Sequence, residues 1–197
     1  MIAADEKSRL RAYYRRALEA IPREELAAIG RRIHANVRTI PEVATATEIL
    51  TYVALPHEIQ TMPLIEQWLV EGKRIFVPYF ADRDSPMAWC VLTNPEGLGT
   101  GPLGVLQPRN ATPESPPPHA PVIVPGLAFT RAGIRLGRGG GHYDHFLAKH
   151  LGLSVGLAIN SMVADQLAAE SHDVRVDVIV TEAEIFGPAG GKVAGKN

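Results

Sequence analysis

The sequence predicts an α/β layered fold with a largely parallel central sheet, on three observations. Strand-like and helix-like segments alternate over residues 48–80, which is typical of strands joined by crossover helices. Further short apolar runs recur after residue 120, each about the length of a buried strand. The chain has 197 residues and 46% hydrophobic content, enough for one compact domain with its own core.

The first 38 residues predict two helices. A helix over residues 5–20 starts at Asp5 as its cap, and Leu10, Tyr14 and Leu18 fall on one side. A second helix starts at Pro22 and carries an apolar stripe of Leu26, Ile29, Ile33 and Val37. This region holds nine lysine and arginine residues against five acidic ones. Either these charges form a solvated face, or part of that face meets an anion.

The middle of the chain predicts most of the sheet. The expected elements are a strand over 48–55, a helix over 63–72, and strands over 73–80 and 87–92. Residues 93–120 are rich in proline and glycine, and we expect a surface excursion that flanks a functional site.

The last third of the chain predicts the remaining elements. Strands are expected at 120–124, 153–159 and 176–181, with a helical pattern over 145–151. Residues 1–186 are therefore expected to form a single domain, followed by a flexible tail over 187–197.

Composition excludes several classes of protein. A formal net charge of −1 argues against a general nucleic-acid binder. No apolar run approaches the roughly 20 residues that span a bilayer, and the N-terminus lacks the apolar core of a signal peptide. The single cysteine, Cys90, cannot form an internal disulfide and is expected in the core. We expect a soluble cytoplasmic protein with no nucleic-acid or membrane partner, and its oligomeric state stays open.

The stretch from Arg135 to Asp144 is the most informative in the chain. Four glycines in the five positions 137–141 let backbone N–H groups approach a ligand closely. A helix start after the loop adds further donors and partial positive charge. Arg135 and Arg138 suit phosphate oxygens, and Asp144 suits Mg²⁺. The combination predicts a centre for phosphoryl transfer.

Other motifs do not fit this stretch. A Walker A loop requires Lys followed by Ser or Thr, and a dinucleotide fingerprint that starts at Gly137 fails at His142. The histidines follow no zinc pattern, and no G-x-S-x-G frame supports a serine hydrolase. A glycine-rich bend with incidental arginines remains the structural alternative.

The run VPGLAFTRAGIRLGRGGGHYDHFL resembles the signature of the 5-formyltetrahydrofolate cyclo-ligase family, roughly PGxxFxxxGxRLGxGxGYYDxxL. The match departs at His142, where the family usually has a tyrosine. Weaker agreement extends to Lys7 and Arg11 on the first helix, to Glu58 after an early strand, and to Asp173 near the end. The family fold is a three-layer Rossmann-like α/β architecture.

The resemblance implies an ATP-dependent ligase that converts 5-formyltetrahydrofolate to 5,10-methenyltetrahydrofolate, ADP and phosphate, with ATP and Mg²⁺ required. It implies catalytic roles for Arg138 and Tyr143, and metal ligation by Asp144 and Asp173. The implied ATP-binding residues are Lys7, Arg11, Arg135, Gly137, Arg138, Gly139, Gly140, Gly141, His142 and Tyr143. The implied folate-binding residues are Val53, Glu58, Arg138 and His142.

Structural alternatives stand beside these roles. Lys7 and Arg11 could be solvated helix charges, Glu58 and Asp173 ordinary turn residues, and Asp144 a helix-start carboxylate. A second hypothesis is a non-catalytic or redirected relative that binds nucleotides or folates. His142 is either a tolerated replacement that packs against the ligand or a sign of such a drift.

Overall fold

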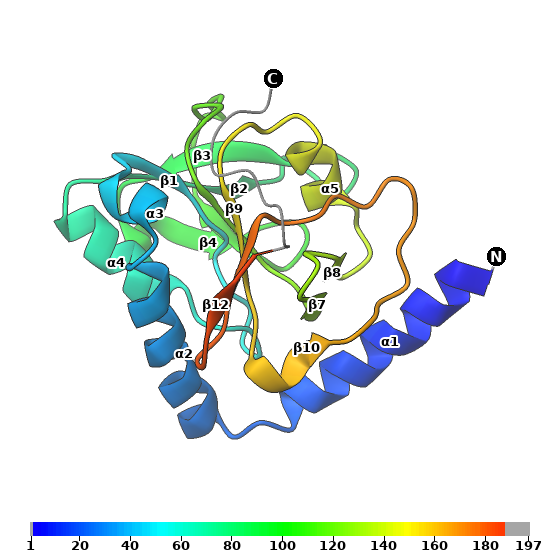
Figure 1. The fold of residues 1–197 in the computed structure, drawn as a ribbon. Coiled ribbons are helices and arrows are strands. Elements are labelled where there is room, and N and C mark those ends of the chain that lie inside the picture. Colours follow the sequence, from blue (N-terminus) through cyan, green and yellow to red (C-terminus); the bar gives the residue numbers. More distant parts are fainter. Residues whose placement is uncertain (1, 188–197) are drawn as a thin grey trace.

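The computed structural model describes residues 2–187, whose arrangement is shown in Figure 1. The helices are α1 (Ile2–Glu19), α2 (Arg23–Val37), α3 (Pro41–Thr45), α4 (Met62–Val70) and α5 (His142–Leu147). The strands of the main sheet are β1 (Glu48–Leu50), β2 (Arg74–Tyr79), β3 (Ala88–Leu92), β6 (Val122–Val124), β9 (Ser154–Leu157), β11 (Val178–Val180) and β12 (Ile185–Phe186). The smaller strands are β4 (Leu98–Thr100), β5 (Leu106–Pro108), β7 (Ala128–Thr130), β8 (Arg135–Leu136) and β10 (Val163–Ala164).

The central sheet of this described part has the order β12-β11-β9-β6-β1-β2-β3. The neighbours from β11 to β2 pair in parallel, and an antiparallel strand, β12 or β3, closes each edge. The predicted α/β fold with a largely parallel sheet is thereby confirmed. Strands β7, β8 and β10 form a small second sheet, and β4 and β5 form a two-stranded hairpin.

Apolar residues cover both faces of the central sheet, because successive side chains of a strand point to opposite faces. Ile49 belongs to the core cluster that includes Ile33 of α2 and Trp68 of α4. Leu50 belongs to the other cluster, with Leu147 of α5. Figure 1 shows α2, α3 and α4 on one side of the sheet and α5 on the other. This gives the three layers that the family resemblance implied.

Several predicted boundaries differ from the structure. Helix α1 begins at Ile2, so Asp5 is not its cap but lies in the first turn and pairs with Arg9. Strand β1 ends at Leu50, although the Thr51 N–H still donates to the Phe76 carbonyl of β2 at 2.9 Å. The next carbonyl, that of Tyr52, accepts from the Thr61 hydroxyl at 2.6 Å instead. The excursion over 93–120 contains the β4–β5 hairpin, which the sequence did not predict.

The order of the strands positions the site. The chain passes from β1 through α4 to β2 on one side, whereas β6 pairs with β1 on its other side. Ligands of open parallel sheets bind at such a switch point, outside the carboxyl ends of the strands. Residues 51–58 follow β1, and Pro125 and Gly126 follow β6, so these segments are expected to border a site.

Three other predictions concern the rest of the chain. Among residues 2–187, no helix has the length and apolar character needed to cross a membrane. Cys90 is buried on β3, as predicted for a core residue, and burial raises the pKa of its thiol. The tail predicted over 187–197 lies outside the described residues, except for its first position.

Candidate active site

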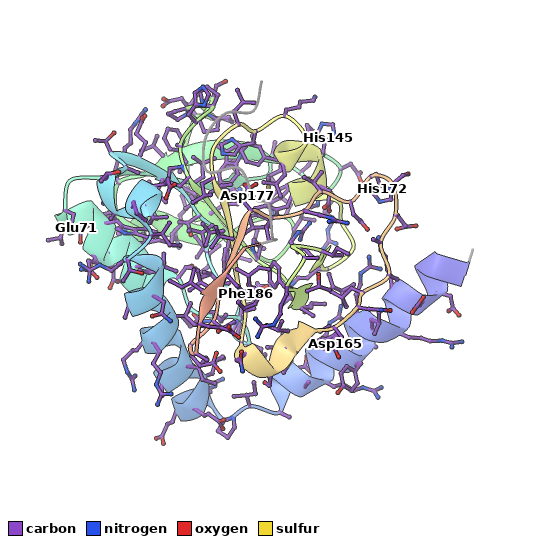
Figure 2. The ribbon with its side chains drawn as sticks, viewed as in Figure 1. Glu71, His145, Asp165, His172, Asp177 and Phe186 are labelled. Atoms are coloured by element: carbon purple, nitrogen blue, oxygen red, sulfur yellow. The ribbon has the colours of Figure 1, made fainter. Side chains whose placement is uncertain are left out.

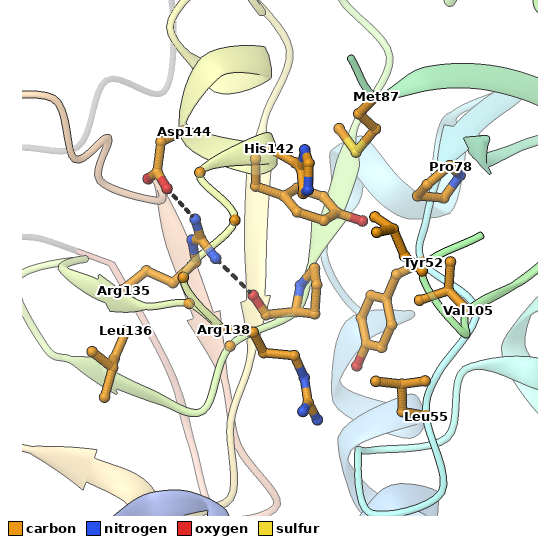
Figure 3. A pocket seen from close by; sticks show the side chains of 18 of the residues that line it. Tyr52, Leu55, Pro78, Met87, Val105, Arg135, Leu136, Arg138, His142 and Asp144 are labelled. Carbon is orange, nitrogen blue, oxygen red and sulfur yellow. Dashed lines mark hydrogen bonds and ion pairs between the residues drawn. The ribbon is translucent and has the colours of Figure 1, made fainter. Parts of the chain in front are cut away.

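A cavity of about 400 Å³ lies at the carboxyl ends of β1, β2 and β6 (Figure 3). Its lining includes every site residue that the sequence singled out: Lys7, Arg11, Val53, Glu58, Arg135, Gly137, Arg138, Gly139, Gly140, Gly141, His142, Tyr143, Asp144 and Asp173. These residues come from positions between 7 and 173, so the fold brings the whole predicted set to one place.

Other residues of the lining were not predicted. They are Tyr52, Leu55, Pro78, Phe80, Met87, Leu103, Val105, Leu106, Pro125, Gly126, Leu136, Glu170 and His172. Most are apolar and lie just beyond strands or on the β4–β5 hairpin, where a sequence pattern cannot separate a pocket wall from a core. Figure 3 shows that Arg135 and Asp144 lie on one side of the cavity, with Pro78, Met87 and Val105 on the other.

The glycine loop lies between β8 and α5. Gly139 and Gly141 have φ angles of 107° and 67°, a region that side-chain-bearing residues rarely adopt. A Cβ atom on Gly140 would lie 2.7 Å from the His142 ring. Helix α5 is only six residues long, so its dipole contributes less than the sequence suggested, and the arginines provide most of the positive charge.

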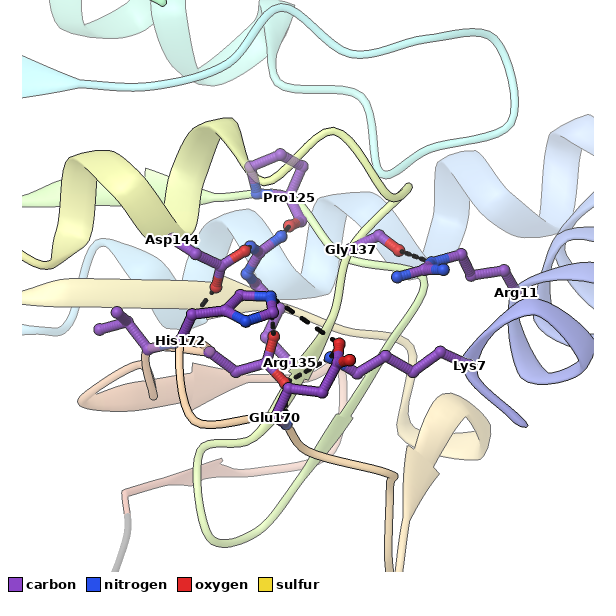
Figure 4. Close-up of polar contacts among 10 residues, drawn as sticks. Lys7, Arg11, Pro125, Arg135, Gly137, Asp144, Glu170 and His172 are labelled. Carbon is purple, nitrogen blue, oxygen red and sulfur yellow. Dashed lines mark hydrogen bonds and ion pairs between the residues drawn. The ribbon is translucent and has the colours of Figure 1, made fainter. Parts of the chain in front are cut away.

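Arg135 and Asp144 form a buried ion pair behind the loop (Figure 4). The Arg135 guanidinium donates to Asp144 Oδ2 at 2.7 Å and to the Pro125 carbonyl at 3.2 Å, and its Nε has no partner in the described structure. Asp144 Oδ1 accepts from the Val174 N–H at 3.2 Å. Arg135 therefore holds the loop to the strand ends, and Asp144 ties α5 to the segment before β11.

Lys7 bridges α1 to the late acidic segment. Its ammonium group lies 2.6 Å from both Glu170 Oε2 and Asp173 Oδ2, and its side chain is 4% exposed. Burial disfavours the charge, but the bonds to Asp173 and Glu170 outweigh it and raise the pKa of Lys7. For Asp173 burial also opposes ionisation, yet the Lys7 bond lowers its pKa. The pairing therefore stabilises the fold at neutral pH, and this stabilisation is lost in acid below the ordinary aspartate pKa of 3.8.

Arg138 and Glu58 face each other across the opening. The Arg138 Nε donates to Glu58 Oε1 at 2.8 Å, and Glu58 Oε2 accepts from the Leu55 N–H at 2.8 Å. Glu58 is thus more than a turn residue, since it joins the segment after β1 to the glycine loop. Arg11 completes the polar side by donating to the Gly137 carbonyl at 3.0 Å (Figure 4).

The aromatic residues of the site have different roles. Tyr143 lies under the Arg135 guanidinium, its hydroxyl is buried without a partner in the described structure, and burial raises the pKa of the phenol. The His142 ring meets the Phe80 ring edge-on, with ring centroids 4.9 Å apart. His142 therefore keeps an aromatic surface at the position where the signature has tyrosine.

The carboxylates fit a hard cation. Glu170, His172 and Asp173 place ligand atoms within 4.8 Å of one another, and Figure 2 shows His172 on the loop that runs past α1. Oxygen donors of this kind suit Mg²⁺. The Lys7 ammonium pairs with both Glu170 and Asp173, and Arg135 pairs with Asp144, so a bound cation would share the acidic groups with both basic side chains.

A Rossmann-like sheet with arginines, a glycine loop and carboxylates around one cavity is the arrangement expected of an enzyme that binds a nucleoside triphosphate. The sequence pattern of the 5-formyltetrahydrofolate cyclo-ligase family matches residues 3–182, and the chain belongs to this family. The ATP-dependent ligase reaction is the activity of the family, so this chain is a ligase with ATP as a substrate.

Individual relatives agree with this assignment. The 5-formyltetrahydrofolate cyclo-ligase of Escherichia coli K12 is 26% identical, and the match covers 87% of this chain and 98% of the relative. The yeast (Saccharomyces cerevisiae) protein of the same name is 27% identical over 88% of this chain and 94% of its own length. The solution structure of Aquifex aeolicus 5,10-methenyltetrahydrofolate synthetase superimposes with a TM-score of 0.82 at 27% identity, over 97% of both chains.

Proposed function

We propose that this cavity converts 5-formyltetrahydrofolate and ATP to 5,10-methenyltetrahydrofolate, ADP and phosphate through a phosphorylated formyl intermediate. One observation carries the proposal: a cationic side suited to phosphates faces an apolar side suited to flat rings across a single cavity (Figure 3). Both substrates can therefore be held with their reacting groups between the two sides.

The chemistry needs little beyond positioning and charge stabilisation. The formyl oxygen is a poor leaving group, so the γ-phosphoryl group is transferred to it and forms an imidate phosphate. N10 of the folate then attacks the activated carbon, the carbon–oxygen bond breaks, and phosphate departs as the ring closes, while the N10 proton is released to water or to the departing phosphate. Arg138 is the residue that we assign to the transferring phosphate, because its partly exposed guanidinium reaches from the glycine loop to Glu58.

The family resemblance and the place of each residue in the cavity lining support the remaining roles. Lys7, Arg11, Arg135 and the glycine loop over 137–141 hold ATP. Glu58 accepts hydrogen bonds from the pterin, with Val53 and His142 beside it. Tyr143, whose hydroxyl is buried and unpartnered in the described structure, offers a neutral donor to a ligand atom. When bound, Mg²⁺ would be held by Asp144 and Asp173 and would neutralise phosphate oxygens.

The reaction itself gives the first prediction. ATP hydrolysis should require both 5-formyltetrahydrofolate and Mg²⁺, because the formyl oxygen of the folate, and not water, accepts the γ-phosphoryl group in the proposed reaction. Absorbance in the methenyl product band, recorded with and without ATP, measures the reaction. ATP hydrolysis at a comparable rate without the folate, or folate binding without turnover, would favour the non-catalytic or redirected relative instead.

Glu58→Gln should raise KM for 5-formyltetrahydrofolate about tenfold and leave KM for ATP within about twofold. A carboxylate accepts from two pterin N–H groups with charge assistance, whereas an amide accepts through one oxygen only. Initial rates with each substrate varied in turn measure both constants. A rise in KM for ATP alone would mean that the two subsites are assigned the wrong way round.

A further inference from the structure

Gln107 of β5 forms an unusual contact with the end of β2. The Phe80 N–H donates to Gln107 Oε1 and Gln107 Nε2 donates to the Phe80 carbonyl, both at 3.0 Å. The Gln107 side chain is buried. Two such bonds to one residue imitate a rung of a β ladder, so they fix both the position and the orientation of the Phe80 backbone.

The β4–β5 hairpin is built around this side chain. A Cβ atom on Gly101 would lie 2.4 Å from Gln107 Oε1, so a glycine is required for the amide to keep its place. The Gly101 N–H donates to the Val105 carbonyl at 2.8 Å and closes the tip, where Gly104 has a φ of 76°. The tip is therefore attached to β2 through Gln107.

The groups that Gln107 holds belong to the apolar side of the cavity. Phe80 meets His142 of the glycine loop edge-on. Leu103 and Val105, at the tip of the hairpin, also line the cavity, whereas Gln107 is not among its lining residues. Figure 3 shows Val105 beside Pro78 and Met87, away from Arg135 and Asp144. Gln107 thus supports the side that suits a flat ring, not the side that suits phosphates.

We infer that Gln107 is a positioning residue that sets the affinity of the site for the aromatic rings of the folate, through Phe80 and the hairpin tip. This inference rests on the proposed function. Gln107 does not touch the ligand: it fixes the wall against which the rings pack, and a preformed wall lowers the ordering cost of binding. ATP binding on the opposite side should be independent of it.

Gln107→Met tests this inference, because methionine fills a similar volume but makes neither hydrogen bond. KM for 5-formyltetrahydrofolate should rise about tenfold, while kcat and KM for ATP stay within about twofold. Calorimetric Kd values for 5-formyltetrahydrofolate without ATP should rise in parallel. Gln166→Met, at an exposed position outside the cavity lining, is the matched control and should behave as the parent protein.

Two further variants separate positioning from mere folding. Gly101→Ala should displace the Gln107 amide and raise the same KM. The double variant His142→Ala/Gln107→Met should raise KM for 5-formyltetrahydrofolate by less than the product of the increases in the two single variants, since both substitutions act through the Phe80 surface. If folded Gln107→Met has the Kd and KM of the parent protein for 5-formyltetrahydrofolate, this inference is wrong and the proposed function is unaffected. Failure of the parent protein to bind 5-formyltetrahydrofolate would overturn the proposed function as well.

Discussion

Arg138→Ala should lower kcat by about 100-fold or more, which corresponds to a barrier increase of about 2.7 kcal/mol. The Arg138 guanidinium is assigned to the phosphoryl group in transit, where negative charge redistributes, so the loss falls on the transition state more than on the bound substrates. Steady-state rates of methenyl product formation, with each substrate varied in turn, give kcat and both KM values.

Arg138→Ala should also affect folate binding, because Arg138 forms an ion pair with Glu58. Glu58 is 11% exposed, and Arg138→Ala removes its charged partner, so KM for the folate should also change, by less than kcat. Arg138→Lys should recover only part of kcat, because a point charge cannot reproduce the planar fork. Arg131→Ala removes an exposed arginine that pairs with Glu184 and serves as the control. A normal kcat in Arg138→Ala would assign Arg138 a structural role.

The glycine loop was predictable because its chemistry lies within ten consecutive residues. Arg135, Arg138, Asp144 and the glycines can be recognised without any knowledge of the fold. What the sequence could not supply is how they are paired. Arg135 lies behind the loop and binds Asp144, whereas Arg138 faces the opening and binds Glu58, 80 positions away. Such pairing depends on the register of separate strands.

The missed residues share a physical reason. Glu170 meets Lys7 across 163 positions, and no local pattern marks it among other acidic side chains. Phe80 and Val105 resemble ordinary core residues, and the two bonds between Gln107 and Phe80 join the hairpin that carries Val105 to the end of β2. The contact after β1 is also non-local, since the Tyr52 carbonyl accepts from the Thr61 hydroxyl, nine positions away. Long-range contacts, not local propensity, decide these features.

Asp144→Asn should change two properties at once. The Asp144 and Arg135 side chains are 15% and 5% exposed, so loss of the carboxylate leaves a buried guanidinium without its counter-charge. We expect the free energy of unfolding to fall by about 3 kcal/mol. We also expect the half-saturating Mg²⁺ concentration for activity to rise, because an amide oxygen is a weaker ligand for a hard cation. Denaturant unfolding and a Mg²⁺ titration of the rate measure the two effects.

The structural and metal roles of Asp144 can be separated with a double variant. Arg135→Met combined with Asp144→Asn removes both charges, and neutral groups in place of a buried ion pair restore most of the lost stability. The weakened response to Mg²⁺ should persist in this protein, since the carboxylate is still missing. Asp84→Asn, at an exposed position outside the cavity lining, is the matched control. An unchanged Mg²⁺ response and maximum rate in folded Asp144→Asn would remove Asp144 from the metal site and leave it only as the partner of Arg135.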